Sequence, residues 1–417
     1  MSVVVTPLAS LADVVKKTVF TAPVHDIHTH LYEPAFGDLL LWGIDDLLTY
    51  HYLVAEFFRF SRISYESFWK LDKVTQADLI WNELFVKRSP LSEACRGVIT
   101  TLQKLGLDPN EENLASIRSW FASQKPAHHV EKCLKLAGVE SVCMTNSPFD
   151  PTERAVWQRS FTRHPSFRTG LRIDPLLLSW PEASATLRSL GYNVSVELSA
   201  QTIQGIRKFL EDWTRKISPL FLMVSLPPTF SFPEESLCHQ ILTQAVLPHC
   251  LDFNLPFALM PGVRRAVNPS LRLAGDGIGH SNIRAVENLC LAFPQNKFLV
   301  TVLGRENQHE LCIAARKFRN LHIFGCWWFT NIPFLIDEIT RLRLELLGAS
   351  FTVQHSDARV MDQVIYKWAH TKEVLSQVLT EKYQALSSAG WELTPARIEK
   401  DVHQLLGGAF YDFCRNP

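Results

Sequence analysis

Two histidines, His28 and His30, stand at the end of a short apolar run that begins at Val24. Alternate residues of an extended strand share one face, so the two imidazoles point the same way and can bind one metal ion. The alternative is a pair of ordinary loop histidines. We favour the metal, because a strand that ends in two parallel imidazoles has replaced apolar side chains at its end, and chemistry is the usual reason.

Asp357 is the candidate for a third ligand, since it follows the last predicted strand of the chain. In a closed barrel the first and last strands are neighbours, which brings Asp357 to His28 and His30. Two imidazoles and one carboxylate leave open positions on a zinc-like ion, and this is typical of a catalytic site. Taken alone, Asp357 has the alternative role of a helix N-cap.

Arginines follow other predicted strands, and their planar guanidinium groups suit a carboxylate ligand. The three that concern us are Arg172, Arg265 and Arg359. Salt bridges to loop carboxylates such as Asp174 are the alternative for each. Three converging arginines favour an anionic small molecule.

His51 and Tyr52 lie in a predicted helix after the first strand. A helix that lays polar aromatic side chains over a site can supply an acid or a base. Ordinary packing of an aromatic helix is the better interpretation of these two residues by themselves.

Short apolar runs bounded by Pro, Gly, Asn or Asp predict eight strands, most of them buried on both faces as in a parallel sheet. They cover residues 24–30, 139–145, 167–174, 220–226, 256–262, 298–303, 321–327 and 351–356. Helical segments separate most of them, at 151–163, 203–217, 234–251, 281–293, 306–319 and 333–347. This alternation predicts an α/β fold, a (β/α)8 TIM barrel. A doubly wound open sheet is the alternative architecture. A dinucleotide-binding fold of that kind lacks its characteristic motif here, because no GxGxxG follows the first strand.

The long stretch 33–137 contains helical patterns and no buried strand, so we expect a helical insertion after the first strand. The chain is predicted to end in helices, at 358–389 and 395–414. Residues 1–417 are thus expected to form one barrel domain that carries the insertion.

The overall composition excludes several classes of protein. The chain has 42 basic and 42 acidic residues, which gives no sign of binding to nucleic acid or to an anionic membrane. No run approaches the ~20 apolar residues of a membrane span, and the start lacks the pattern of a signal peptide. The nine cysteines form no CxxC and several lie in apolar runs, which predicts reduced thiols in the cytoplasm.

Six motifs follow one another along the chain: His28-x-His30, Asp45 to His51-Tyr52 with Arg59, Arg172-x-Asp174, Gly262 followed by Arg264-Arg265, Gly325-x-Trp327-Trp328-Phe329, and Ser356-Asp357-x-Arg359. Together they make the chain similar to the uronate (glucuronate) isomerase family of the amidohydrolase superfamily, and it resembles the shorter bacterial members most closely. The resemblance implies isomerisation of D-glucuronate to D-fructuronate and of D-galacturonate to D-tagaturonate, by proton transfer through a cis-enediol.

The resemblance also implies site roles. One divalent metal, expected to be zinc, binds to the histidine pair and Asp357, and no nucleotide cofactor is needed. Arg172, Arg359 and Arg265 contact the sugar acid, and Trp328 walls the pocket. The C2 proton passes to Asp357 or to ionised Tyr52, and His51 or Tyr52 assists ring opening and proton return. Many members carry a histidine on the fifth strand where this chain has Met260.

Two other functions are compatible with such a site. A metal-dependent hydrolase of a sugar lactone or amide is the first, although the predicted fourth, fifth and sixth strands end without further metal ligands. A non-catalytic sugar-acid sensor is the second, but a sensor has no need for the acid and base residues. The large insertion is rich in aromatic residues that could form contacts between subunits, so the sequence is compatible with a homo-oligomer.

Overall fold

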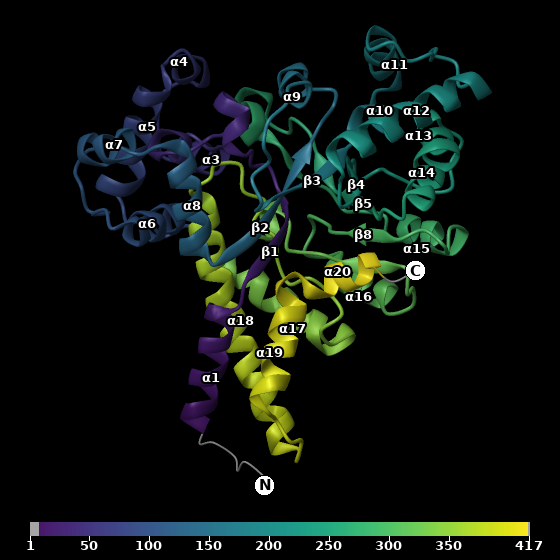
Figure 1. The fold of residues 1–417 in the computed structure, drawn as a ribbon. Helices are drawn as coiled ribbons and strands as arrows, with labels where there is room; N and C mark the ends of the chain where they lie inside the picture. Colours follow the sequence, from purple (N-terminus) through teal and green to yellow (C-terminus); the bar gives the residue numbers. More distant parts are fainter. Residues whose placement is uncertain (1–7, 416–417) are drawn as a thin grey trace.

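A computed structural model describes residues 8–415 and has one curled parallel sheet at its centre (Figure 1). The strand order is β1-β2-β3-β4-β5-β8-β9, so each strand pairs with its neighbour in the chain, apart from the small hairpin between β5 and β8. The strands are β1 Val24–Thr29, β2 Val139–Asn146, β3 Phe167–Arg172, β4 Leu222–Leu226, β5 Phe257–Pro261, β8 Phe298–Val300 and β9 Leu321–Ile323. Seven of the eight predicted strands are confirmed, and with them the α/β class.

The eighth predicted strand, 351–356, is wrong as a regular strand. It makes one isolated bridge, between Thr352 and Phe324. The segment nevertheless joins both ends of the sheet, because Thr352 N donates to Ile323 O at 3.0 Å and Asp357 N donates to His28 O at 3.2 Å. It is irregular because backbone N–H groups here bond to side chains, as Ser356 N does to Asp26 Oδ1.

Helices link the strands on the outside of the sheet (Figure 1). Those that follow β2 to β9 are α9 Pro151–Trp157, α10 Asp174–Leu178, α11 Trp180–Ser189, α12 Ala200–Ile217, α13 Leu237–Ile241, α14 Leu247–Asp252, α15 Ile283–Ala292, α16 Gln308–Ala315 and α17 Pro333–Leu347. The predicted helices are present, but α9 and α16 are shorter than expected. The sequence patterns missed α10 and α11, and also the β6 Val263–Arg264 and β7 Gly277–Ile278 hairpin.

Residues between β1 and β2 form helices and contribute no strand to the sheet. The α-helices are α2 Ile44–Leu48, α3 His51–Phe57, α4 Tyr65–Trp69, α5 Lys73–Trp81, α6 Glu93–Leu105, α7 Ala115–Ala122 and α8 Pro126–Ala137. They lie together on one side of β1 (Figure 1), and α6 and α8 contact the long helix α18, Gln363–Ser388.

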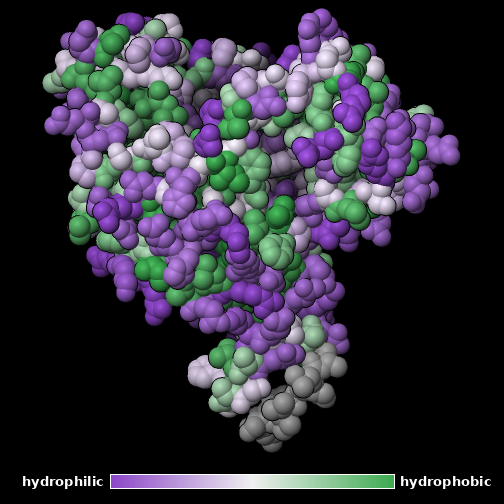
Figure 2. All heavy atoms as spheres, turned by 180° about the vertical axis from the view of Figure 1, so that it is seen from behind, coloured by the Kyte–Doolittle hydropathy of each residue, from purple (hydrophilic) through white to green (hydrophobic). Residues whose placement is uncertain are grey.

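Three further helices lie beside or beyond α18. They are α1 Leu8–Thr21, α19 Pro395–His403 and α20 Ala409–Arg415. The sequence patterns missed α1, which packs against α18 and α19. Hydrophilic residues cover most of the face seen in Figure 2, where apolar residues form scattered groups. No helix within residues 8–415 is long and apolar enough to cross a membrane.

Acid is expected to weaken the fold through His322, a β9 side chain that is 4% exposed and bonds through Nε2 to Thr352 Oγ1 at 3.0 Å. Burial, with Arg343 nearby, lowers the pKa of His322 to about 3 from 6.5. Between these two pH values the unfolded chain binds a proton at His322 that the folded chain does not. The contribution of His322 to the stability of the fold is therefore complete above pH 6.5 and is lost as the pH falls from 6.5 towards 3. The loss attributable to His322 is about 2 kcal/mol between pH 7 and pH 5.

The check is urea unfolding of the native protein and of His322→Gln at both pH values. The variant should lose about 2 kcal/mol less than the native protein does. His309→Gln, which alters an exposed histidine on α16, is the control and should follow the native protein. Equal losses in the native protein and His322→Gln would contradict the assignment.

Candidate active site

The three predicted metal ligands lie together at the carboxyl end of β1. Nε2 of His28 and Nε2 of His30 are each 3.3 Å from Oδ1 of Asp357. The side chains of His28 and Asp357 are 1% and 7% exposed, whereas that of His30 is 29% exposed. The cluster therefore has one side open to a ligand.

Backbone bonds hold this geometry. His30 N donates to Ala358 O at 2.7 Å, and Asp357 takes the left-handed conformation, with φ of 53°. A non-glycine residue in that region is strained, which fits a functional position. The helix N-cap alternative for Asp357 is wrong, because α18 begins at Gln363 and Asp362 is its N-cap residue.

Thr145 fixes the tautomer of His30. Its hydroxyl donates to Thr29 O at 3.0 Å and lies 2.9 Å from His30 Nδ1. Because the single hydroxyl proton is used on Thr29, Nδ1 of His30 must be the donor in the second bond. Nε2 of His30 then keeps its lone pair facing Asp357, as a metal ligand requires.

The cluster fits a divalent cation. Among the described residues, both ring nitrogens of His28 and Oδ1 of Asp357 are buried with no hydrogen-bond partner. An ionised carboxylate between two imidazole nitrogens is a donor set suited to zinc.

The three predicted arginines differ in their position and in their hydrogen-bond partners. The Arg359 guanidinium donates to His30 O at 3.2 Å and to Leu39 O at 2.9 Å, beside the cluster. Arg172 is bound through Nε and one terminal nitrogen by Asp174, at 3.0 and 2.8 Å, which leaves its other terminal nitrogen for a ligand. The Arg265 side chain is 57% exposed on the β6–β7 hairpin and pairs with Asp276 at 2.5 Å.

His51 and Tyr52 begin α3, which lies against the residues after β9. The His51 ring is 5.3 Å from the Trp328 ring and 4.3 Å from the Tyr52 ring. Burial lowers the pKa of His51 to about 4, so its imidazole is neutral at pH 7. Burial also raises the pKa of Tyr52 well above 10. Trp327 packs in the core instead and is 4% exposed.

Comparison with solved structures identifies the family. A uronate isomerase from Bacillus halodurans C-125 is 50% identical, with a TM-score of 0.97, over 99% of this chain and 98% of that one. The chain belongs to the uronate isomerase family. A uronate isomerase from Thermotoga maritima (15% identity, TM-score 0.79, 97% of both chains) and a glucuronate isomerase from Caulobacter crescentus (15%, 0.78, 98% and 95%) share the fold. No protein-family model and no curated protein matches the chain.

This member of the uronate isomerase family has two charged residues beside the site that the sequence analysis did not select. Asp26 is 1% exposed and accepts hydrogen bonds from Ser356 N at 3.0 Å and Trp368 Nε1 at 2.8 Å. Lys367 donates to Asn331 O at 3.3 Å, and burial lowers its pKa to about 8. Asp26 stands two residues before His28 on the same strand and could have been found from that position, whereas nothing near Lys367 in sequence marks it.

Gly325 allows the segment after β9 to pass close to His355. It has φ of 65°, and a Cβ atom at this position would collide with the His355 imidazole. His355 is fully buried, and its ring lies 4.9 Å from that of His28. The glycine thus lets an imidazole fill the space beneath the metal cluster.

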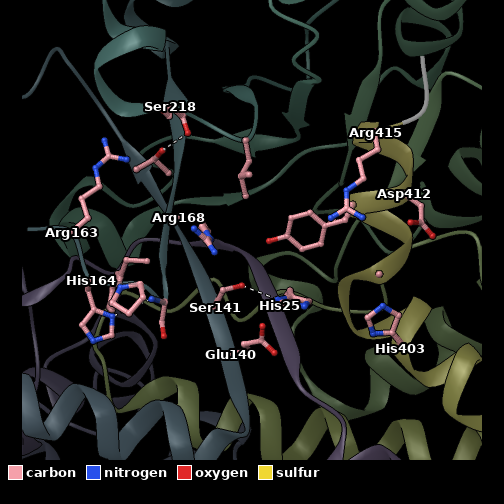
Figure 3. A pocket seen from close by; sticks show the side chains of 17 residues that line it. His25, Glu140, Ser141, Arg163, His164, Arg168, Ser218, His403, Asp412 and Arg415 are labelled. Atoms are coloured by element: carbon pink, nitrogen blue, oxygen red, sulfur yellow. Dashed lines mark hydrogen bonds between the residues drawn. The ribbon is translucent and has the colours of Figure 1, made fainter.

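A cavity of about 850 Å³ lies at the opposite end of β1, β2 and β3 (Figure 3). The first residues of these strands line it, with side chains from α19 and α20. None of the three predicted metal ligands, His28, His30 and Asp357, lines this cavity. Active sites of (β/α) barrels form at the carboxyl ends of the strands, so the position of this cavity at the amino ends of β1, β2 and β3 does not favour it as the candidate active site.

Proposed function

We propose that this chain catalyses the reversible isomerisation of the aldose D-glucuronate to the ketose D-fructuronate, and of D-galacturonate to D-tagaturonate. The observation that carries the proposal is the cluster of His28, His30 and Asp357 in a chain that is half identical to a uronate isomerase over almost its whole length. The reaction moves a proton from C2 to C1 through a cis-enediol and needs no hydride carrier.

Arg359 and Arg172 bind the sugar acid in this proposal. Each guanidinium has nitrogens beyond those used on neighbouring oxygens, and Arg359 lies beside the cluster. Charged hydrogen bonds to the substrate carboxylate and to the developing enediolate are stronger than neutral ones. Arg265 is a weaker candidate, because it is exposed and already paired with Asp276.

His28, His30 and Asp357 would hold the divalent metal, which we propose to be zinc. Such an ion, when bound, would supply Lewis-acid chemistry. The orphaned imidazole nitrogens of His28 and the tautomer of His30 support this assignment.

Asp357 is the residue we assign as the base that takes the C2 proton. The alternative, an ionised Tyr52, is disfavoured because burial keeps the phenol of Tyr52 protonated. A protonated phenol suits the opposite role, so Tyr52 donates a hydrogen bond or a proton to the substrate oxygen. The neutral imidazole of His51 carries protons during ring opening, and Trp328 beside it keeps water away.

The remaining expectations fit this function. We propose that residues 351–357 stand in for the eighth barrel strand and that 33–137 is an insertion within a single domain, 1–417. Each of the nine cysteines is free, which supports a cytoplasmic enzyme. We propose that the chain binds small sugar acids, that it forms a homo-oligomer, and that it binds neither nucleic acid nor membranes.

Proton NMR in heavy water tests the proposal. The purified protein is incubated with D-galacturonate or D-glucuronate, with and without a chelator. A new ketose with deuterium at C1, and deuterium at C2 of the recovered aldose, are expected because the abstracted proton exchanges with solvent. A slower reaction after chelation would support the metal. No ketose and no exchange with either sugar acid would reject isomerisation.

A further inference from the structure

A second group of metal-binding side chains lies apart from the candidate active site. His129 and Cys133 are four residues apart on α8, so they share one face of the helix. The carboxylate of Asp362, the residue before α18, lies against both side chains. None of the three side chains is more than 1% exposed. The group belongs to neither the proposed catalytic residues nor the motifs of the sequence analysis.

The donor atoms of these residues converge. His129 Nε2 is 2.7 Å from Asp362 Oδ1 and 3.3 Å from Cys133 Sγ, and the sulfur is 4.0 Å from the carboxylate oxygen. Three points at these separations lie on a circle with a radius of about 2.0 Å, which is close to the ~2.0–2.3 Å bonds of zinc to nitrogen, oxygen and sulfur. An ion therefore fits with little movement of the side chains.

We propose that His129, Cys133 and Asp362 bind a second divalent metal ion, with zinc the best match to a donor set of nitrogen, sulfur and oxygen. A thiolate and a carboxylate together balance the charge of the ion, so the occupied group is neutral. Neutrality matters here because an unbalanced charge is costly in a buried position.

The surroundings of His129, Cys133 and Asp362 indicate that the proposed metal stabilises the fold and takes no part in catalysis. The rings of Trp42 and Phe121 lie 5.0 and 5.5 Å from the His129 ring and exclude solvent. The second oxygen of Asp362 accepts a hydrogen bond from Gly43 N at 2.7 Å. An ion here ties α8 to the turn that carries Asp357 and Arg359, five and three residues before Asp362.

Cobalt distinguishes this site from the active site, because only this one contains a cysteine. The full chain is produced in minimal medium with Co²⁺ as the added metal, so that the ion is present while the protein folds. We expect a thiolate-to-cobalt charge-transfer band in the near ultraviolet. In Cys133→Ser the band should disappear and the bound metal should fall by one equivalent per chain. Cys290→Ser, which alters another buried cysteine, should keep the band.

A second variant keeps the test decisive if Cys133→Ser does not fold. His28→Asn/His30→Asn lacks the active-site ligands, and we expect it to retain the band and one equivalent of cobalt. Absence of the band from both the native protein and this double variant would overturn the proposal, as would a band of native strength in folded Cys133→Ser. In that case the three residues form a buried hydrogen-bonded group and bind no metal.

Discussion

Replacement of Asp357 by asparagine is expected to lower kcat/KM for uronates by at least about 10³-fold. The asparagine amide cannot accept a proton at neutral pH, so the assigned base is lost. It is also a poorer metal ligand than a carboxylate and brings N–H donors towards His28 and His30, each of which faces Asp357 at 3.3 Å. Steady-state kinetics with both uronates, alongside circular dichroism to verify the fold, measures the effect.

Asp150→Asn is the matched control for this substitution. Asp150 caps α9 by accepting a hydrogen bond from Glu153 N at 2.9 Å, and asparagine is an equally good N-cap. The substitution should lower the free energy of unfolding by only a few tenths of a kcal/mol. Because the protein stays folded and Asp150 has no assigned role in the reaction, we expect kcat/KM within about twofold of the native value. A folded Asp357→Asn protein with more than a tenth of native activity would contradict the role of Asp357 as base.

Replacement of Arg359 by methionine is expected to lower kcat/KM by about 10²- to 10³-fold, the loss of a charged hydrogen-bond clamp worth about 3–4 kcal/mol. Methionine keeps much of the side-chain volume and removes the charge. Both kcat and KM should change, because the guanidinium is assigned to the substrate carboxylate and to the enediolate. Arg359→Lys should recover part of the rate, since it restores charge without the planar fork.

Arg265→Met removes a charge of the same kind from an exposed position. The side chain of Arg265 is 57% exposed and bound to Asp276, so the substitution should change kcat/KM by less than about threefold, the scale of an exposed ion pair. Comparable losses in Arg265→Met and Arg359→Met would mean that general surface charge, and not a clamp at the cluster, attracts the substrate. Unchanged turnover by folded Arg359→Met would remove the clamp altogether.

The metal cluster was predictable because it follows from two simple rules. The two-residue period of a strand places His28 beside His30, and the expected adjacency of the first and last predicted strands brings Asp357 to them. Both rules use local sequence and strand order alone, and the structure agrees with each.

Other features depended on contacts between distant residues, which no local pattern contains. Lys367 reaches Asn331 across 36 residues, and the Asp362 carboxylate meets His129 across 233. The irregular path of 351–357 was missed for a related reason. Its residues have the apolar start of a strand, but its backbone bonds to partners such as Asp26, 330 residues earlier. Composition cannot distinguish a buried strand from such a segment.

The close approach of Gly325 to His355 has a consequence for how this family varies. Any side chain at position 325 collides with the imidazole, so a relative with a larger residue there must carry a smaller one at position 355. The two positions are 30 residues apart in the chain, yet they are expected to co-vary. Such paired change would link the sequence of the segment after β9 to the shape of the space beneath the metal cluster.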